Sequence, residues 1–444
     1  MASSPAVAST AIEAKTIRKV QKRIIPYIFL LYIIAYLDRI NVGIAALTMN
    51  KELAITSQQF GLLFGIFFFG YFLFEIPSNL MLHKIGPRIW IARILISWGI
   101  VSMLNCFAQN VVHVYVLRFL LGVAEAGFFP GIILYLTYWF RQREQAQTVA
   151  LFMTALAVAP IVGFPLSGLI LDHAHWLGIS SWRWLFVLEA FPAILFGILT
   201  YQLLPGRPAE AKFLTQEERH WIAQELAREE QSKLQAHNTS ALRALADGKV
   251  WHLALIYFSL TVAFYATNSW MPQIVRSLSS RWSNTAVGIV GIVPYLAGLI
   301  AMVLVSTHSD RTMERRYHAA ISVITGGVAL LALRATHSTP AIIVLLSAAV
   351  MGMYSFYGPF WSIPSQFLSG YSAACGIALI NSIGNLGGFA GPYVVGVISK
   401  KTTLQGGLAL IGVSLFLTAV LLLLLPKEKQ MRSETLSRAH STAR

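Results

Sequence analysis

The sequence predicts an all-α membrane protein with twelve transmembrane helices in two six-helix halves. Of its 444 residues, 56% are hydrophobic and only 12% are charged, whereas soluble proteins carry about 25% charged residues. Twelve spans of about 20 apolar residues would use roughly 240 residues, which matches this hydrophobic share. The composition excludes a soluble enzyme, a disordered chain and a single-span receptor. Long unbroken apolar runs also argue against a β-barrel, whose strands are short and alternating.

Twelve apolar segments of spanning length follow one another along the chain. The first six are expected at about 24–46, 60–82, 89–108, 111–138, 145–171 and 184–204. The second six are expected at about 251–275, 285–306, 317–336, 341–364, 371–398 and 404–425. The first segment follows basic residues as a signal peptide does, but it is too long and lacks a cleavage pattern. We therefore expect it to remain as a true span.

Lys and Arg residues are distributed unevenly between the two sets of loops. If the N-terminus lies in the cytoplasm, 25 of the 34 lysines and arginines fall in segments on that side and seven in the opposite loops. Basic residues are enriched in cytoplasmic loops. This bias explains the net charge of +15, so the charge does not indicate a nucleic-acid-binding protein. The bias also predicts that both termini are cytoplasmic.

A polar stretch at 205–250 separates the two sets of spans. Within it, Thr215 and Glu218 have the spacing of a capping box, which predicts a helix over 216–235. The expected organisation is a cytoplasmic tail (1–23), an N-terminal six-helix half (24–204), a cytoplasmic linker (205–250), a C-terminal six-helix half (251–425) and a second cytoplasmic tail (426–444). Two fused repeats are typical of secondary transporters, whose site lies between the repeats near mid-membrane.

Four ionisable residues lie deep in predicted spans: Asp38 and Arg39 in the first, Arg118 and Glu125 in the fourth. Each costs at least about 2.5–3.5 kcal/mol in a membrane, so each must face an interior cavity and find partners. Arg118 and Glu125 are about two helical turns apart and therefore share one helix face. A structural ion pair that joins neighbouring helices is one interpretation.

Coupling of an anion to protons is the interpretation that we favour for these four residues. Two guanidinium groups and two carboxylates sum to zero charge, and an incoming organic anion unbalances them. Protonation of Asp38 or Glu125 would cancel that charge and free an arginine, whose planar fork matches a carboxylate.

The remaining polar residues are given smaller roles. Glu75 and Glu189, in the second and sixth spans, are expected to be structural. Several mid-span residues are candidate ligands or interhelical contacts: Tyr36, Tyr71, Tyr265, Asn268, Trp361, Asn381 and Asn385. Glycines between 384 and 391 predict close helix packing, a bend, or both.

Sequence signals of enzymes are missing. The chain has no phosphate-binding loop of an ATP-driven pump and no motif that joins a nucleophile to a base. Its two cysteines, Cys106 and Cys375, give neither a disulfide framework nor a metal cluster. We expect no enzymatic activity, no cofactor and no metal.

Five segments together resemble the anion:cation symporters of the major facilitator superfamily. They are residues 36–41, 74–79, 118–131, 308–316 and 378–391, and they cover both halves. The family is similar to bacterial carriers of tartrate, phthalate and sugar acids. The resemblance implies the major facilitator fold, a bacterial inner-membrane location and proton-coupled uptake of organic anions.

The resemblance also implies roles for individual residues. Asp38 and Glu125 would be the proton-linked carboxylates, with Arg118 paired to Glu125 and Arg39 near the substrate carboxylate. Further substrate contacts would come from both halves: Tyr36, Tyr71, Arg118, Trp361 and Asn381. In the loop after the eighth span, Asp310 and Arg311 would act in gating.

Two departures from the superfamily pattern bear on these roles. The first-half cytoplasmic loop lacks the usual acid where this chain has Leu82 or His83, which puts that loop's gating pair in doubt. The antiporter motif of the fifth span is only partial around Pro160 and Gly163, which favours symport.

The sequence thus predicts a monomeric proton:organic-anion symporter in a lipid bilayer. One alternative is a proton antiporter or effluxer of amphiphilic compounds. A second is a membrane sensor that binds an anion without moving it, although no large soluble output domain is present. The identity of the carboxylate, the proton stoichiometry and the order in which Asp38 and Glu125 titrate stay open.

Overall fold

The computed structural model describes residues 5–236, 247–364 and 370–426, and this part of the chain contains helices and no strand. The first set of helices is α1 (Pro5–Glu52), α2 (Ser57–Ile85), α3 (Pro87–Met103), α4 (Val111–Glu125), α5 (Phe128–Thr137), α6 (Gln142–Met153), α7 (Ala155–His173) and α8 (Ser181–Leu203). Helix α9 (Gln216–Ala236) follows. The second set is α11 (Gly248–Leu278), α12 (Asn284–Thr312), α13 (Arg316–Ala332), α14 (Thr339–Ser355), α15 (Tyr357–Trp361), α16 (Gly370–Asn385), α17 (Gly387–Ile398) and α18 (Leu404–Leu424). Short 3₁₀ turns are η1 (Leu104–Phe107), η2 (Trp176–Gly178), η3 (Pro208–Glu210) and η4 (Leu333–Ala335).

The predicted fold class is confirmed. Among the described residues, 11 helical segments are long and apolar enough to cross a membrane, and they coincide with eleven of the twelve predicted spans. The remaining predicted span, 371–398, corresponds to α16 and α17, which meet at Leu386. Helix α1 begins at Pro5, so the helix starts well before the apolar segment that the sequence predicts from residue 24.

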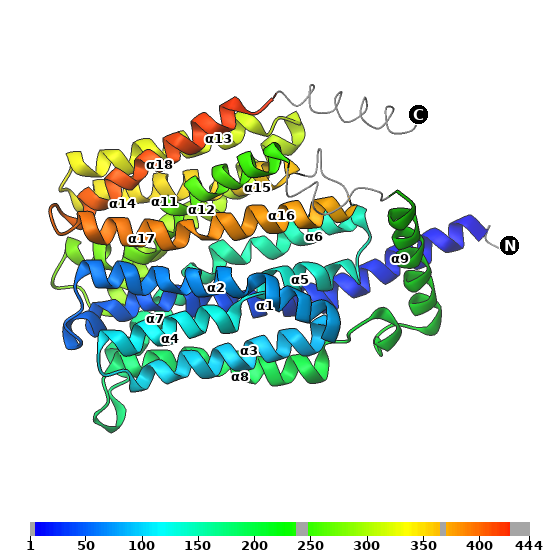
Figure 1. The fold of residues 1–444 in the computed structure, drawn as a ribbon, viewed down its shortest axis with the longest axis horizontal. Helices are drawn as coiled ribbons and strands as arrows, with labels where there is room; N and C mark the ends of the chain where they lie inside the picture. The colour runs from blue at the N-terminus through cyan, green and yellow to red at the C-terminus, as the bar shows by residue number, and fades with distance from the viewer. Residues whose placement is uncertain (1–4, 237–246, 365–369, 427–444) are drawn as a thin grey trace.

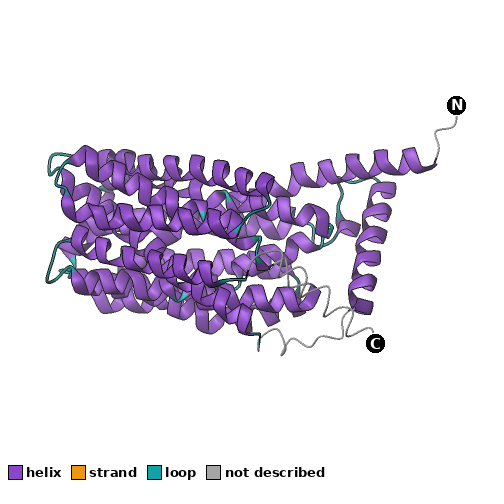
Figure 2. Ribbon diagram, turned by 90° about the horizontal axis from the view of Figure 1, so that it is seen from above, coloured by secondary structure: helices purple, strands orange, loops and turns teal. Residues whose placement is uncertain are grey.

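The two sets of helices run side by side along the long axis of the molecule (Figure 1). Helix α9 lies across one end, beside the N-terminal part of α1 (Figures 1 and 2). We call this the α9 end and the opposite one the far end. Within the first half, α1 packs on α7 and α8, and α2 packs on α4. The halves meet where α2 packs on α17 and α7 packs on α12.

Helix α9 confirms the helix that the capping box predicts. The backbone N–H of Thr215 donates to Glu218 at 2.9 Å, and the N–H of Glu218 donates to the Thr215 hydroxyl at 3.3 Å. The same carboxylate binds Lys19 of α1 at 2.7 and 2.8 Å. Burial raises the pKa of Glu218, but the bonds from Lys19 and Thr215 outweigh burial and hold that pKa below its usual value.

The far end is closed by direct contact between the halves. A methyl group added at Gly61 of α2 would lie 2.4 Å from the carbonyl oxygen of Pro392 in α17, so only glycine allows this approach. Asp172, near the end of α7, accepts four hydrogen bonds of 2.6–3.0 Å from Asn284 and Thr285 at the start of α12. A carboxylate is favoured at a helix N-terminus. Polar and steric contacts thus join the halves at this end.

The α16–α17 segment shows the close packing that its glycines predict. The helix stops at Asn385 and restarts at Gly387. A methyl group added at Gly391 would lie 2.0 Å from the carbonyl oxygen of Val262 in α11. Close packing therefore occurs beside an interruption of the helix at Leu386, whose backbone stays in the right-handed helical region.

Candidate functional site

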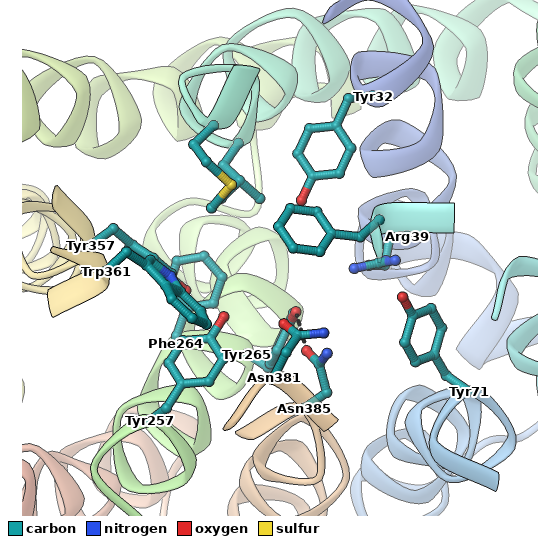
Figure 3. A pocket seen from close by; sticks show the side chains of 13 residues that line it. Tyr32, Arg39, Tyr71, Tyr257, Phe264, Tyr265, Tyr357, Trp361, Asn381 and Asn385 are labelled. Carbon is teal, nitrogen blue, oxygen red and sulfur yellow. Dashed lines mark hydrogen bonds between the residues drawn. The ribbon is translucent and has the colours of Figure 1, made fainter. Parts of the chain in front are cut away.

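A narrow cavity lies between the two halves, and side chains of both halves line it (Figure 3). The first half lines it with Tyr32, Arg39, Tyr71, Phe129, Met153 and Leu156. The second half lines it with Tyr257, Phe264, Tyr265, Tyr357, Trp361, Asn381 and Asn385. About 400 Å³ between these side chains is not filled by atoms, but only about 20 Å³ admits the centre of a water molecule. The walls must therefore move apart to admit a molecule larger than water.

Arg39 is the cation of this cavity. Its guanidinium points into the space between Tyr32 and Tyr71 (Figure 3). The same guanidinium donates a hydrogen bond to Glu125, and both side chains are buried. The expected pair of Arg118 and Glu125 is therefore replaced by a pair of Arg39 and Glu125.

Helix geometry explains why Arg118 does not hold Glu125. The two residues share a face of α4, but seven residues give a rise of about 10.5 Å between them. None of the three guanidinium nitrogens of Arg118 has a hydrogen-bond partner among the described residues. Its guanidinium carbon instead lies 5.5 Å from the centre of the Phe67 ring, and that of Arg39 lies 5.4 Å from the same ring. One aromatic ring of α2 thus contacts both buried cations.

A break after Glu125 fixes the position of that carboxylate. Helix α4 ends at Glu125, Gly127 has φ = 85°, and α5 begins at Phe128. Ser78 of α2 donates to the carbonyl oxygen of Ala126 at 2.6 Å and in turn accepts from the Trp90 indole at 2.9 Å. A side chain at Gly127 would collide with Ser78. Residues of the 74–79 and 118–131 motifs therefore stabilise the break together.

Asp38 lies behind the cavity wall. It is buried in α1 and accepts hydrogen bonds from Ser102 and, at 3.2 Å, from Asn41. Its second oxygen has no hydrogen-bond partner in the described part of the chain. Asp38 interacts electrostatically with both Arg118 and Arg39. The four ionisable residues singled out in the sequence are thus brought into one buried region.

Glu75 has a partner that its sequence position could not reveal. It is buried in α2 and accepts from Asn381 at 3.1 Å and from Ser382 at 2.5 Å, both in α16 of the other half. These contacts join the halves beside the cavity, because Asn381 also lines it. Glu75 therefore connects the halves and is not merely a contact within one of them.

The structure brings most of the predicted site residues together. Arg39, Tyr71, Trp361 and Asn381 line the cavity, whereas Tyr36 and Arg118 are buried outside its lining. Asn385, also named from sequence, lines the cavity and accepts from the Tyr265 hydroxyl at 3.3 Å.

Other lining residues were missed from sequence. Tyr32, Tyr257, Tyr357 and Phe264 line the cavity as well. Their only sequence signal is an aromatic side chain near the middle of a span, which packing residues share.

The predicted gating residues lie elsewhere, near the end of α12. Asp310 forms an ion pair with Arg315 at 2.5 Å, and Ser309 donates to the carbonyl oxygen of Glu314 at 2.6 Å. Arg311 is exposed beside them. This loop is at the α9 end of the second half.

Comparisons with known proteins agree with this architecture. Residues 28–392 match the family model described as Major Facilitator Superfamily. The chain is 44% identical over 430 residues to a protein of Agrobacterium vitis named "Putative tartrate transporter", covering 97% of this chain and 95% of that protein. It is 37% identical over 390 residues to a quinolone resistance transporter of Acinetobacter baumannii, covering 88% of this chain and 90% of that protein.

A solved structure shows the same fold at low sequence identity. The xylose transporter XylE from E. coli superposes with a TM-score of 0.72 at 14% identity, covering 91% of this chain and all of that one (100%). The relatives and structural neighbours are transporters, so the protein is a transporter and not an enzyme. The expected family resemblance is confirmed: the chain belongs to the Major Facilitator Superfamily.

Proposed function

We propose that this protein imports a small organic anion together with protons by alternating access. The substrate class is a carboxylate such as tartrate, a sugar acid or an aromatic acid. One observation carries the proposal: Arg39 lines the central cavity while its guanidinium is bound to Glu125. The similarity to a protein named as a tartrate transporter supports the substrate class.

The Arg39–Glu125 pair gives a direct way to couple the two fluxes. Arginine keeps its charge at every working pH, and its fork matches a carboxylate. While Glu125 is ionised, it occupies that fork and competes with a substrate carboxylate. Protonation of Glu125 removes the competitor, so Arg39 can bind the substrate anion. Loss of the proton restores the internal pair and releases the substrate.

Asp38 supplies the second proton-linked carboxylate of the proposal. It lies close enough to Arg118 and Arg39 to balance their charge. Arg118 has no hydrogen-bond partner among the described side chains. Its positive charge therefore acts on the cavity mainly through the electrostatic potential that it creates there. When an anion and a proton enter together, the net charge of this buried region does not change.

Cavity residues of both halves would recognise the rest of the substrate. Tyr71 from α2 and Trp361 and Asn381 from the second half offer a hydroxyl, an indole N–H and an amide. Tyr36 and Arg118 lie outside the lining, so their proposed contact with substrate requires the walls to move. Asp310 and Arg311 remain the proposed gating residues.

The proposed orientation places the α9 end in the cytoplasm of a bacterial inner membrane. Both termini would then be cytoplasmic, and the protein would act as a monomer in the lipid bilayer. The organisation into two halves (24–204 and 251–425), a linker (205–250) and two tails (1–23 and 426–444) is part of the same proposal. The contacts between α2 and α17 would then close the outer side.

Reconstituted protein tests this function directly. Tartrate, a sugar acid and an aromatic acid are offered in turn to liposomes that contain the protein, while external pH is recorded. Symport predicts uptake of at least one acid with alkalinisation of the medium. Uptake that acidifies the medium would instead establish an antiporter, and binding without uptake would establish a sensor.

The antiporter alternative rests on a specific observation. A quinolone resistance transporter is 37% identical to this chain, and the cavity wall is rich in aromatic rings. Adding an amphiphilic quinolone to the same liposomes distinguishes the two functions, because an effluxer moves it against protons.

A further inference from the structure

A second buried acid of the first half lies outside the central cavity. Glu189 of α8 is only 5% exposed, and one of its oxygens accepts from the Ser167 hydroxyl of α7 at 2.6 Å. Its other oxygen, Oε2, has no hydrogen-bond partner among the described residues. No ion pair involves Glu189 in that part of the chain. A buried ionised carboxylate left in this state is costly.

Asn41 of α1 lies between Glu189 and Asp38. Its amide donates to Asp38 at 3.2 Å, and it also lies within interaction range of the Glu189 carboxylate. This contact is possible because α1 packs against both α7 and α8. Glu189 and Asp38 are close enough to interact electrostatically. The acid of α8 is thereby linked to a residue of the proposed coupling site.

Each of these three residues leaves one buried acceptor atom unpaired. These atoms are Oε2 of Glu189, Oδ1 of Asn41 and Oδ2 of Asp38, none of which has a partner in the described residues. Acceptors without donors are unfavourable when buried. A protonated carboxyl group adds the missing O–H donor. One proton placed on Glu189 or Asp38 therefore supplies a donor to this cluster.

Charge balance supports the same conclusion. Four carboxylates are buried in the described spanning helices, those of Asp38, Glu75, Glu125 and Glu189, against the guanidiniums of Arg39 and Arg118. The acids exceed the arginines by two. Neutrality of these groups therefore requires two of the four carboxyl groups to be protonated. Glu189 has no ion pair in the described part of the chain, so protonation there removes one of the two excess charges.

We propose that Glu189 is an additional proton-binding site of the transport cycle, which exchanges its proton with Asp38 beside Asn41. The proton leaves one carboxyl oxygen and binds the other, so charge is conserved within the pair. Glu189 lies eight residues after Ser181, which places it about 12 Å from the far end of α8. The site is thus between the far end and the central cavity. This inference rests on the proposed proton coupling.

The number of coupled protons is the quantity to measure. Liposomes containing wild-type protein or the E189Q variant are clamped at zero membrane potential, and a one-unit pH gradient is imposed. The tartrate gradient that stops net flux is then determined. Each coupled proton contributes about tenfold to this balancing ratio per pH unit. We expect the ratio for E189Q to be about tenfold lower, while tartrate exchange without a pH gradient stays within about twofold.

Matched variants separate proton binding from structural support. S167A removes the donor to Glu189 but keeps the acid, so its balancing ratio should equal that of the wild type. E189D keeps a titratable group and serves if E189Q does not fold; its ratio should also be that of the wild type. An unchanged ratio in a folded E189Q variant would overturn the proposal.

Failure of the underlying function gives a different result. If the balancing tartrate ratio of the wild type does not respond to the pH gradient, proton coupling itself is wrong. A wild-type response together with an equal response in E189Q removes only the role of Glu189. An equal loss of ratio in S167A and E189Q would assign Glu189 a structural role and also contradict the proposal.

Discussion

Asp172 of α7 and Thr285 of α12 form the polar seal between the two halves at the far end. One carboxylate oxygen accepts both the backbone N–H of Thr285 at 2.7 Å and its hydroxyl at 2.6 Å. Neither helix could make these bonds after the halves separate at this end. The bonds therefore stabilise the conformation in which the far end is closed.

Removal of this seal should favour opening of the far end. We expect D172A to increase the rate at which a cysteine introduced at the buried Val287 reacts with a charged maleimide by at least about tenfold, or 1.4 kcal/mol. The measurement uses a background without the native cysteines. H173A, at the neighbouring exposed position, should react at the parental rate. Equal rates in D172A and the parent would show that packing alone closes this end.

The two buried arginines should respond differently to lysine. Arg39 donates to Glu125 through one guanidinium nitrogen, whereas Arg118 has no hydrogen-bond partner among the described residues. R39K should lower tartrate uptake by at least about tenfold, because an ammonium group cannot replace a bidentate fork. R118K keeps the positive charge and should reduce tartrate uptake less than R39K does. Initial uptake rates of both variants, at matched expression, test the order, and a greater loss in R118K contradicts it.

Neutralisation of Glu125 should weaken the pH dependence of binding. Glutamine resembles the protonated acid and leaves Arg39 free at every pH. Tartrate binding to E125Q should therefore change less with pH between about 5 and 8 than wild-type binding, which weakens as pH rises. Exchange of tartrate should persist, while accumulation driven by a pH gradient falls because one coupled proton is lost. Isothermal titration and liposome uptake measure the two effects, and an unchanged pH dependence in E125Q would count against the mechanism.

Glu75 and Ser382 should show an energetic interaction across the halves. Their hydrogen bond is 2.5 Å long and buried. A double-mutant cycle with E75Q, S382A and the double variant should give a coupling energy of about 0.5–3 kcal/mol in thermal unfolding. The pair of E75Q with S414A, whose hydroxyl lies in α18, provides an additive control. Additive effects of E75Q and S382A would remove this contact as a link between the halves.

Docking of α9 on α1 should depend on pH through Glu218. Its folded-state pKa is lowered from 4.5, because the bonds from Lys19 and Thr215 outweigh burial. This stabilisation is therefore complete above about pH 4.5 and is lost as pH falls through the lower folded-state value. Fluorescence of Trp221 in α9, recorded from pH 7 to pH 3, should change over that acid range. K19M should show a weaker change, and an identical titration would contradict the role of Lys19.

The helical framework follows from the sequence because a bilayer imposes long apolar segments on any spanning helix. Which buried side chains pair with one another does not follow from the sequence in the same way. Arg118 and Glu125 share a helix face, yet Glu125 binds Arg39 of another helix. That outcome depends on how α1 packs near α4 and on the break at Gly127, neither of which spacing reveals.

The contacts of Glu75 show the same limit more clearly. Its partners Asn381 and Ser382 are 306 and 307 residues away in the chain. A single sequence indicates that such an acid is buried, but tertiary packing decides what it meets. The structural role expected for Glu75 stays a prediction, and its contacts with the other half could not be foreseen from the sequence.

The positions of the polar groups on the cavity wall affect which stereoisomer of a substrate can bind. The wall's hydroxyl and amide groups come from two different sets of helices, with Tyr32 and Tyr71 on one side and Asn381 and Asn385 on the other. Such an arrangement has no mirror plane. A hydroxylated diacid and its enantiomer cannot satisfy the same donors equally, and each unmatched group costs about 1 kcal/mol. This transporter should therefore prefer one stereoisomer over its mirror image.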